Sequence, residues 1–134
     1  MLIHKKILLV DDDLDDQEIF LDILKQIEPA LECTVANNGL EAIEILFKET
    51  DPPSLILLDL NMPKMNGLEC LTTLKKDERL KTIPVVMLTT SSDPPSAQRS
   101  LKMGAQLFLT KSASVAGIKS QLQQVLEMNF VGQF

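Results

Sequence analysis

Residues 8–16 read LLVDDDLDD, an apolar run that ends abruptly in acidic residues. Five of the six residues from 11 to 16 are aspartate, and carboxylates this close together repel one another. The apolar residues before them favour a buried strand, which would place the acidic residues at its carboxyl end. This stretch therefore predicts a strand that delivers negative charge to one edge of a sheet.

Short apolar segments and amphipathic segments alternate along the whole chain. We expect strands at residues 5–10, 31–36, 54–58, 83–88 and 107–110, and helices at 14–27, 40–48, 68–80, 93–103 and 114–129. Five strands alternating with five helices predict right-handed crossovers and a parallel sheet covered on both faces. We therefore predict a three-layer α/β/α fold in a single domain over residues 1–134, with a core at about 5–128 and a tail at 129–134.

Composition limits the classes of partner. The chain has 134 residues, 45% of them hydrophobic, with a formal net charge of -6 and no long basic run, so it lacks the positive patch that nucleic-acid binding needs. No apolar segment approaches the roughly 20 residues that span a bilayer, and the first residues do not resemble a signal peptide. We expect a cytoplasmic protein. His4, the one histidine, is expected at the surface before the first strand.

Ligands of open α/β sheets bind beyond the carboxyl ends of the strands, so the residues delivered there matter most. The predicted strands deliver Asp11, Asp12, Asp59, Thr89 and Lys111. Three carboxylates in one depression require a cation or protonation, and oxygen ligands favour Mg²⁺. A lysine and a threonine beside them suit phosphate, and a carboxylate relieved of its charge can attack phosphorus.

The other three aspartates have a structural interpretation. Asp13 is placed to cap the helix at 14–27, and Asp15 and Asp16 would lie in its first turn. Negative charge is stabilised there by free backbone N–H groups and by the helix dipole.

Four segments resemble the receiver domains of two-component response regulators. They are LLVDDD (8–13), LLDLNMPKMNG (57–67), PVVMLTTSSD (84–93) and GAQLFLTK (104–111), and the likeness runs from residue 5 to about residue 127. The resemblance implies a flavodoxin-like fold with a five-stranded parallel sheet in the order 2-1-3-4-5.

The resemblance also implies roles for the site residues. Asp59 would be the phosphoacceptor, charged by a phosphohistidine of a partner kinase. Asp12 and Asp59 would bind Mg²⁺ directly, with Mn²⁺ as the second candidate, while Asn61 would supply its backbone carbonyl and Asp11 would act through water.

Thr89 and Lys111 would hold the phosphoryl oxygens. Phe108 matches the aromatic residue whose rotamer follows the threonine in the family's switch, although a plain core aromatic fits the same pattern. Met62, Pro63 and Gly67 would shape the loop after the phosphoacceptor.

Two positions depart from the family's usual pattern. Ser112 follows Lys111 where the family usually carries a cis proline, and a cis bond before serine costs roughly 3–4 kcal/mol, so we expect a trans bond. The Lys-Ser junction resembles stand-alone receivers that work with phytochrome-type histidine kinases. Thr90 stands where a smaller residue is common, and we expect it to narrow access to the phosphoryl group.

Output would come from protein contacts, because we expect no room for an effector domain after the last helix. The family presents its fourth helix, fifth strand and fifth helix to partners, which also makes this face the candidate for a homodimer. Phe130 and Phe134 in the tail suggest a further partner contact, or a tail that folds back on its own domain.

Four alternatives remain open. The chain could relay the phosphoryl group to another protein, or act as a receiver-shaped scaffold that is never phosphorylated. It could be a phosphatase with Asp59 as nucleophile, although Asn61 stands where such enzymes place a second aspartate. A flavodoxin-like cofactor binder is disfavoured because the aspartates at 11–16 would repel an anionic phosphate. We expect self-catalysed phosphoryl transfer and slow autodephosphorylation but no other enzymatic activity.

Overall fold

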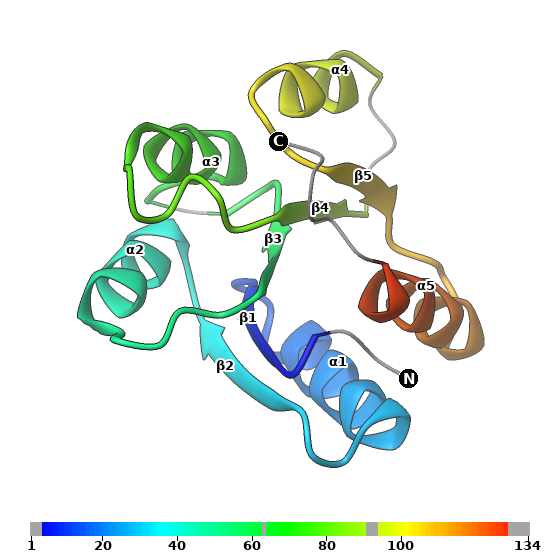
Figure 1. The fold of residues 1–134 in the computed structure, drawn as a ribbon. Helices are drawn as coiled ribbons and strands as arrows, with labels where there is room; N and C mark the ends of the chain where they lie inside the picture. Colours follow the sequence, from blue (N-terminus) through cyan, green and yellow to red (C-terminus); the bar gives the residue numbers. More distant parts are fainter. Residues whose placement is uncertain (1–3, 63, 91–93, 129–134) are drawn as a thin grey trace.

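The computed structural model describes residues 4–62, 64–90 and 94–128, in which strands and helices alternate (Figure 1). The elements are β1 (Lys6–Val10), α1 (Leu14–Ile27), β2 (Glu32–Ala36), α2 (Gly39–Lys48), β3 (Leu55–Asp59), α3 (Gly67–Lys76), β4 (Val85–Thr89), α4 (Pro94–Lys102), β5 (Leu107–Thr110) and α5 (Val115–Glu127). All strands pair in parallel, in the order β2-β1-β3-β4-β5, which confirms the predicted sheet.

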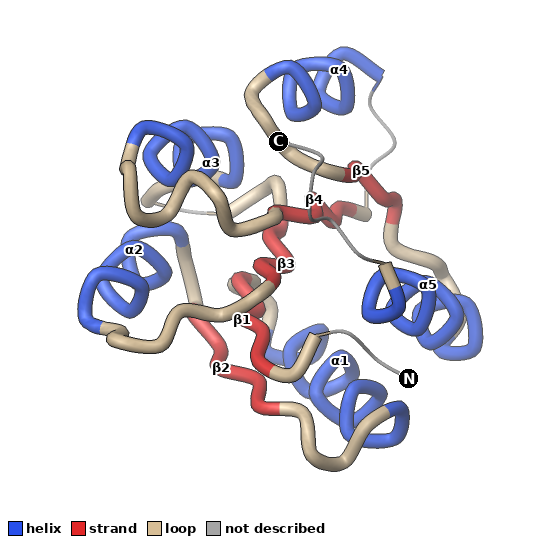
Figure 2. The backbone as a smooth tube through the Cα atoms, viewed as in Figure 1, coloured by secondary structure: helices blue, strands red, loops and turns tan. Residues whose placement is uncertain are grey.

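Helices cover both faces of the sheet (Figures 1 and 2). α1 and α5 lie on one face, and α2, α3 and α4 lie on the other. Successive residues of β1 alternate between the two apolar cores, with Ile7 and Leu9 facing α1 and α5, and Leu8 and Val10 facing the opposite side. Each central strand is therefore buried on both faces, and the three-layer prediction is confirmed.

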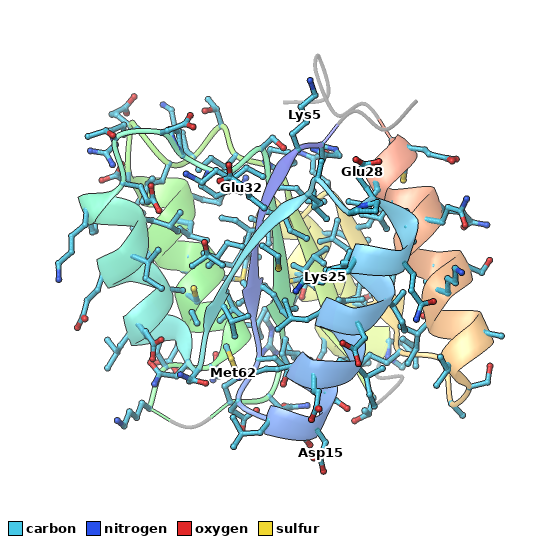
Figure 3. The ribbon with its side chains drawn as sticks, turned by 90° about the horizontal axis from the view of Figure 1, so that it is seen from below. Lys5, Asp15, Lys25, Glu28, Glu32 and Met62 are labelled. Atoms are coloured by element: carbon cyan, nitrogen blue, oxygen red, sulfur yellow. The ribbon has the colours of Figure 1, made fainter. Side chains whose placement is uncertain are left out.

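Capping residues place the helix starts at the edge where the strands end. Asp13 caps α1, since its Oδ1 accepts the backbone N–H groups of Asp15 and Asp16 at 2.9 and 3.1 Å. Asn66 and Glu69 form a reciprocal capping box at the start of α3. Figure 3 shows Asp15 at one end of the molecule and Lys5 at the other, so the strands run toward the acidic end.

Most element boundaries agree with the sequence prediction to within one or two residues, and two of the differences have a clear physical reason. α3 ends at Lys76 rather than at residue 80, because the Asp77 carboxylate accepts the N–H groups of Arg79 and Leu80 and closes a turn. β4 begins at Val85 rather than at residue 83, which excludes Pro84, a residue without an N–H to donate to a ladder.

The surface position expected for His4 is wrong. Its side chain is buried, with Nδ1 2.9 Å from Ser54 Oγ and Nε2 2.9 Å from the Met128 carbonyl oxygen. Because a carbonyl only accepts, Nε2 carries the proton. The imidazole thereby joins the segment before β1 to Met128, the residue that follows α5.

Some sequence predictions fall on residues outside the described ranges, namely Pro63, Asp93 and the tail at 129–134 with Phe130 and Phe134. Among the described helices, none combines the length and the apolar character needed to cross a bilayer.

Candidate functional site

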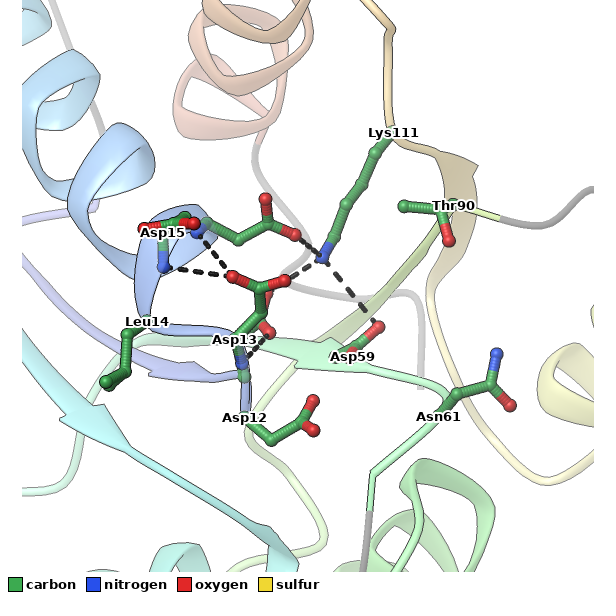
Figure 4. A pocket seen from close by; sticks show the side chains of 10 residues that line it. Asp12, Asp13, Leu14, Asp15, Asp59, Asn61, Thr90 and Lys111 are labelled. Atoms are coloured by element: carbon green, nitrogen blue, oxygen red, sulfur yellow. Dashed lines mark hydrogen bonds and ion pairs between the residues drawn. The ribbon is translucent and has the colours of Figure 1, made fainter.

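The carboxyl ends of the strands surround an open depression of about 610 Å³ (Figure 4). Its walls come from the β1–α1 loop and the first turn of α1, the end of β3 and the loop after it, the residue after β4 and the residue after β5. The lining residues are Asp11, Asp12, Asp13, Leu14, Asp15, Asp16, Asp59, Asn61, Thr90 and Lys111. Most of the residues predicted from strand ends therefore meet in one place.

Three carboxylates converge in this depression. Asp11, Asp12 and Asp59 can each offer one oxygen such that all three oxygens lie within 4.8 Å of one another. Asp11 and Asp59 are buried whereas Asp12 is exposed, so the group has two fixed members and one that faces solvent. An all-oxygen donor set of this size fits a hard divalent cation.

The backbone around these carboxylates is held firmly. The Asp11 N–H donates to the Ala36 carbonyl at 3.1 Å, and the Gln17 side-chain amide donates to the Asp11 carbonyl at 2.6 Å. Asp59 is the last residue of β3, and Gly67 follows one loop later. A Cβ at Gly67 would collide with the carbonyl oxygen of Asp59, so glycine is what lets α3 approach this loop.

Lys111 reaches into the depression from the end of β5. Its Nζ lies 2.8 Å from Asp11 Oδ2, 2.9 Å from Asp16 Oδ2 and 3.8 Å from Asp59 Oδ1, and its side chain is only 5% exposed. Figure 4 shows the Lys111 side chain pointing into the depression, with a dashed line from its ammonium to Asp59. The Lys111 Nζ also lies over the Phe20 ring, 5.6 Å from its centroid.

The surroundings of Asp59 disfavour the charged form of its carboxyl group. Burial raises the pKa of the Asp59 carboxyl to about 7, Lys111 opposes the shift, and the charges of Asp11 and Asp12 add to it. Burial lowers the pKa of the Lys111 ammonium, but the hydrogen bonds that it donates to Asp11 and Asp16 outweigh that effect and raise the pKa. A carboxylate whose charge is this poorly compensated is the kind of ligand that gains most from a bound cation.

The structural role assigned to Asp16 is incomplete. Asp16 does lie in the first turn of α1, but its carboxylate also binds the Lys111 ammonium. Sequence reasoning missed this contact because the two residues are 95 positions apart. The available signal was the i, i+4 spacing of Asp16 and Phe20, which puts them on one face of the helix.

Of the two threonines at the end of β4, one is buried in the interior and the other lines the depression. Thr89 is fully buried and is not among the lining residues, whereas the exposed Thr90 is. Asn61 Nδ2 lies 3.5 Å from Thr89 Oγ1, at the limit for a hydrogen bond. Phe108, partly buried, packs against the core on the side of α2, α3 and α4.

The loop after Lys111 is fastened to α5. The Ser112 N–H donates to Gln121 Oε1 at 3.1 Å, and Gln121 Nε2 donates to the Thr110 carbonyl at 2.7 Å. The described residues contain no cis peptide bond, so the expected trans bond at Lys111–Ser112 is confirmed. Gln121 thus holds the backbone on both sides of the lysine, a role that the sequence alone did not suggest.

Comparisons with known proteins agree with this architecture. Residues 7–123 match the response regulator receiver domain family. The chain is 35% identical over 126 residues to response regulator Rcp1 of Synechocystis, which covers 90% of this chain and 86% of that protein. It is also 35% identical to chemotaxis protein CheY1 of Helicobacter pylori, with 92% of this chain and 98% of that protein covered.

Two solved structures of response regulators share this fold. The phosphorylated cyanobacterial phytochrome response regulator RcpA superimposes with a TM-score of 0.84 at 35% identity, over 91% of each chain. The Mn²⁺-bound form of Rcp1 superimposes with a TM-score of 0.84 at 34% identity, over 93% of this chain and 96% of that one.

Proposed function

Because this chain belongs to the response regulator receiver family, we propose that Asp59 accepts a phosphoryl group from the phosphohistidine of a histidine kinase. The observation that carries the proposal is the placement of Asp59, a buried carboxylate that shares one depression with Asp11, Asp12 and the Lys111 ammonium.

In the proposed step, an Asp59 carboxylate oxygen attacks the phosphorus and the phosphorus–nitrogen bond of the donor breaks. The electron pair of that bond stays on the imidazole nitrogen, and Asp59 becomes an acyl phosphate. The chain's own contribution is positioning and charge compensation, since little covalent chemistry is required of the other residues. Lys111, 3.8 Å from Asp59 before transfer, is placed to pair with a phosphoryl oxygen.

The donor set fits Mg²⁺, or Mn²⁺ in its place. Asp12 and Asp59 would bind the ion through their carboxylates, Asn61 through its backbone carbonyl and Asp11 through a water molecule. A bound ion would offset the carboxylate charges that otherwise repel a phosphoryl donor. The similarity to Rcp1, which has been solved in a Mn²⁺-bound form, supports this assignment.

Signalling would follow from rearrangement at the end of β4. We propose that Thr89 turns toward the phosphoryl group and that Phe108 changes rotamer with it, so that α4, β5 and α5 present a changed face. This face is the proposed contact for a downstream protein and the candidate for a homodimer. Phosphorylation would shift the population between two arrangements rather than create a new fold.

The partner kinase we propose is of the phytochrome type, on the strength of the similarity to RcpA and Rcp1. A cytoplasmic location fits this role. Relay of the phosphoryl group to another protein is the second candidate role, because an acyl phosphate is a good phosphoryl donor as well as a switch.

Incubation with acetyl phosphate and Mg²⁺, followed by intact-mass measurement, tests the proposal. We expect one phosphoryl adduct on the wild type, none on Asp59→Asn and none when a chelator replaces Mg²⁺. An unmodified wild type, or an adduct that persists in Asp59→Asn, would refute the assignment of Asp59.

A further inference from the structure

We propose that Asp16 competes with the phosphoryl group of phosphorylated Asp59 for the Lys111 ammonium, so that α1 sets how tightly the site holds that group. The inference rests on the proposed function of Asp59. Asp16 is then a positioning residue that acts on the phosphoryl group through Lys111.

The geometry shows Lys111 held away from Asp59. Its Nζ makes close contacts of 2.8 Å with Asp11 and 2.9 Å with Asp16, while the distance to Asp59 is 3.8 Å. An ammonium has three N–H groups, and two of them are engaged by these close partners. A phosphoryl group on Asp59 would compete with both of them for the same ammonium.

Helix α1 contacts the Lys111 ammonium through two side chains on one of its faces. Asp16 and Phe20 are four residues apart, and both lie against the ammonium, the carboxylate at 2.9 Å and the ring centroid at 5.6 Å. Since residues at i and i+4 lie one above the other on a helix, a single turn of α1 supplies a charge and a π face to the same cation.

Of the two close partners, Asp16 is the one that can release Lys111. The Asp16 side chain is 31% exposed, so water can solvate its carboxylate when the lysine moves. The Asp11 side chain is only 2% exposed, so breaking its contact with Lys111 would leave the buried Asp11 carboxylate without its partner. Movement of Lys111 toward a phosphoryl group should therefore exchange the Asp16 contact and keep the Asp11 contact.

Asp15 supplies a matched control. It lies beside Asp16 in the first turn of α1, its N–H donates to the same Asp13 oxygen, and it is exposed. Among the ion pairs of the described residues, Lys111 pairs with Asp11, Asp16 and Asp59. Asp15→Asn therefore removes the same charge from the same turn without removing a partner of Lys111.

The test is titration of wild type, Asp16→Asn, Asp15→Asn and Asp16→Glu with beryllofluoride, a stable mimic of the phosphoryl group, at saturating Mg²⁺. We expect Asp16→Asn to bind at least roughly threefold more tightly than Asp15→Asn, the effect of losing one competing ion pair. Asp16→Glu, which keeps a carboxylate, should return the affinity toward that of the wild type.

Equal affinities for Asp16→Asn and Asp15→Asn, or weaker binding by Asp16→Asn, would overturn the role of Asp16 while leaving the proposed function intact. A wild type that binds no beryllofluoride and takes no phosphoryl group from acetyl phosphate would overturn both. Asp16→Ser serves as a second variant with the same expected result, so that the outcome does not depend on the folding of one protein.

Discussion

Asp59 lies in a position where ionisation is unfavourable, because it is buried and two further carboxylates lie close by. The Lys111 ammonium is nearest to Asp11 and Asp16, so it compensates Asp59 only from 3.8 Å. Asp59 is therefore unfavourable for the stability of the metal-free fold, although the proposed function requires it. A protein selected for stability alone would not place a carboxylate here.

The metal-free protein should lose stability as the pH rises, and Asp59→Asn should not share that loss. The Asp59 pKa is about 7 in the folded state against an ordinary value of 3.8, so the folded state binds more protons between these values. The stabilisation present below about pH 4 is therefore lost as the pH rises through about 7. Urea unfolding in EDTA at pH 5 and 8 measures this.

At pH 8 we expect Asp59→Asn to be more stable than the wild type by on the order of 1–3 kcal/mol, and the gap to be smaller at pH 5. Asp22→Asn, an exposed change on α1, serves as the control. Added Mg²⁺ should stabilise the wild type more than Asp59→Asn, because an ion that binds only the folded state shifts the unfolding equilibrium. A gap that does not change with pH would contradict the argument.

Ser100, on α4, offers a separate prediction at the scale of one atom. Its hydroxyl is fully buried and has no hydrogen-bond partner among the described residues. Ser100→Ala removes that unsatisfied group, so we expect the free energy of unfolding to stay the same or rise by about 1 kcal/mol. Thermal unfolding of Ser100→Ala measures this effect, with Ser120→Ala, an exposed change, as the control. A clear loss of stability in Ser100→Ala would show that the Ser100 hydroxyl has a hydrogen-bond partner in solution.

At the scale of elements, sequence patterns located the helices and strands well wherever a cap or an apolar run marks the end. The predicted bounds of α1 and β5 agree with the structure, because Asp13 caps the first and a run of three apolar residues followed by Thr110 makes up the second. The end of α3 was misplaced because Asp77 closes a turn with its own side chain, which overrides the apolar stripe that continues past it.

The β5–α5 connection depends on one side chain of α5. Gln121→Met keeps the length of that side chain but removes its hydrogen bonds to Thr110 and Ser112. We expect the Ser112 amide to exchange with solvent faster and the free energy of unfolding to fall by about 1–2 kcal/mol.

Amide hydrogen exchange, with Gln124→Met as the exposed control on the same helix, measures the effect. Because Lys111 lies between the two bonded residues, Gln121→Met should also slow labelling by acetyl phosphate. Unchanged exchange at Ser112 in Gln121→Met would mean that the loop is held by other contacts.

At the scale of the whole molecule, His4 connects the two ends of the described chain. Its imidazole bridges Ser54, the residue before β3, and Met128, the residue after α5. Burial lowers the pKa of His4 from its ordinary value of 6.5, and the hydrogen bond to Met128 only partly opposes this.

Since the folded state binds the His4 proton less readily than the unfolded state, stability should fall as the pH drops below about 6.5. Thermal unfolding of the wild type and of His4→Gln between pH 5 and 8 tests this. The difference between the two curves should favour the wild type most at the high-pH end. Curves that run parallel across the range would remove His4 from the explanation.

The sequence by itself determined the sheet, its covering helices and the meeting of Asp11, Asp12, Asp59 and Lys111. The physical reason is that a helix between successive strands returns the chain to the same end of the sheet, so all the strands run parallel and the residues at their carboxyl ends share one edge. The order of the elements along the chain is enough to produce this arrangement.

Only the tertiary structure decided which partners these groups have. The pairing of Lys111 with Asp16, the clamp by Gln121 and the burial of His4 all depend on how α1 and α5 dock against the sheet and turn about their axes. Apolar periodicity shows that a helix faces the core, but a charged or polar residue at the margin of that face can turn to solvent or to a partner. The packing of the neighbouring elements determines whether such a residue faces solvent or a partner.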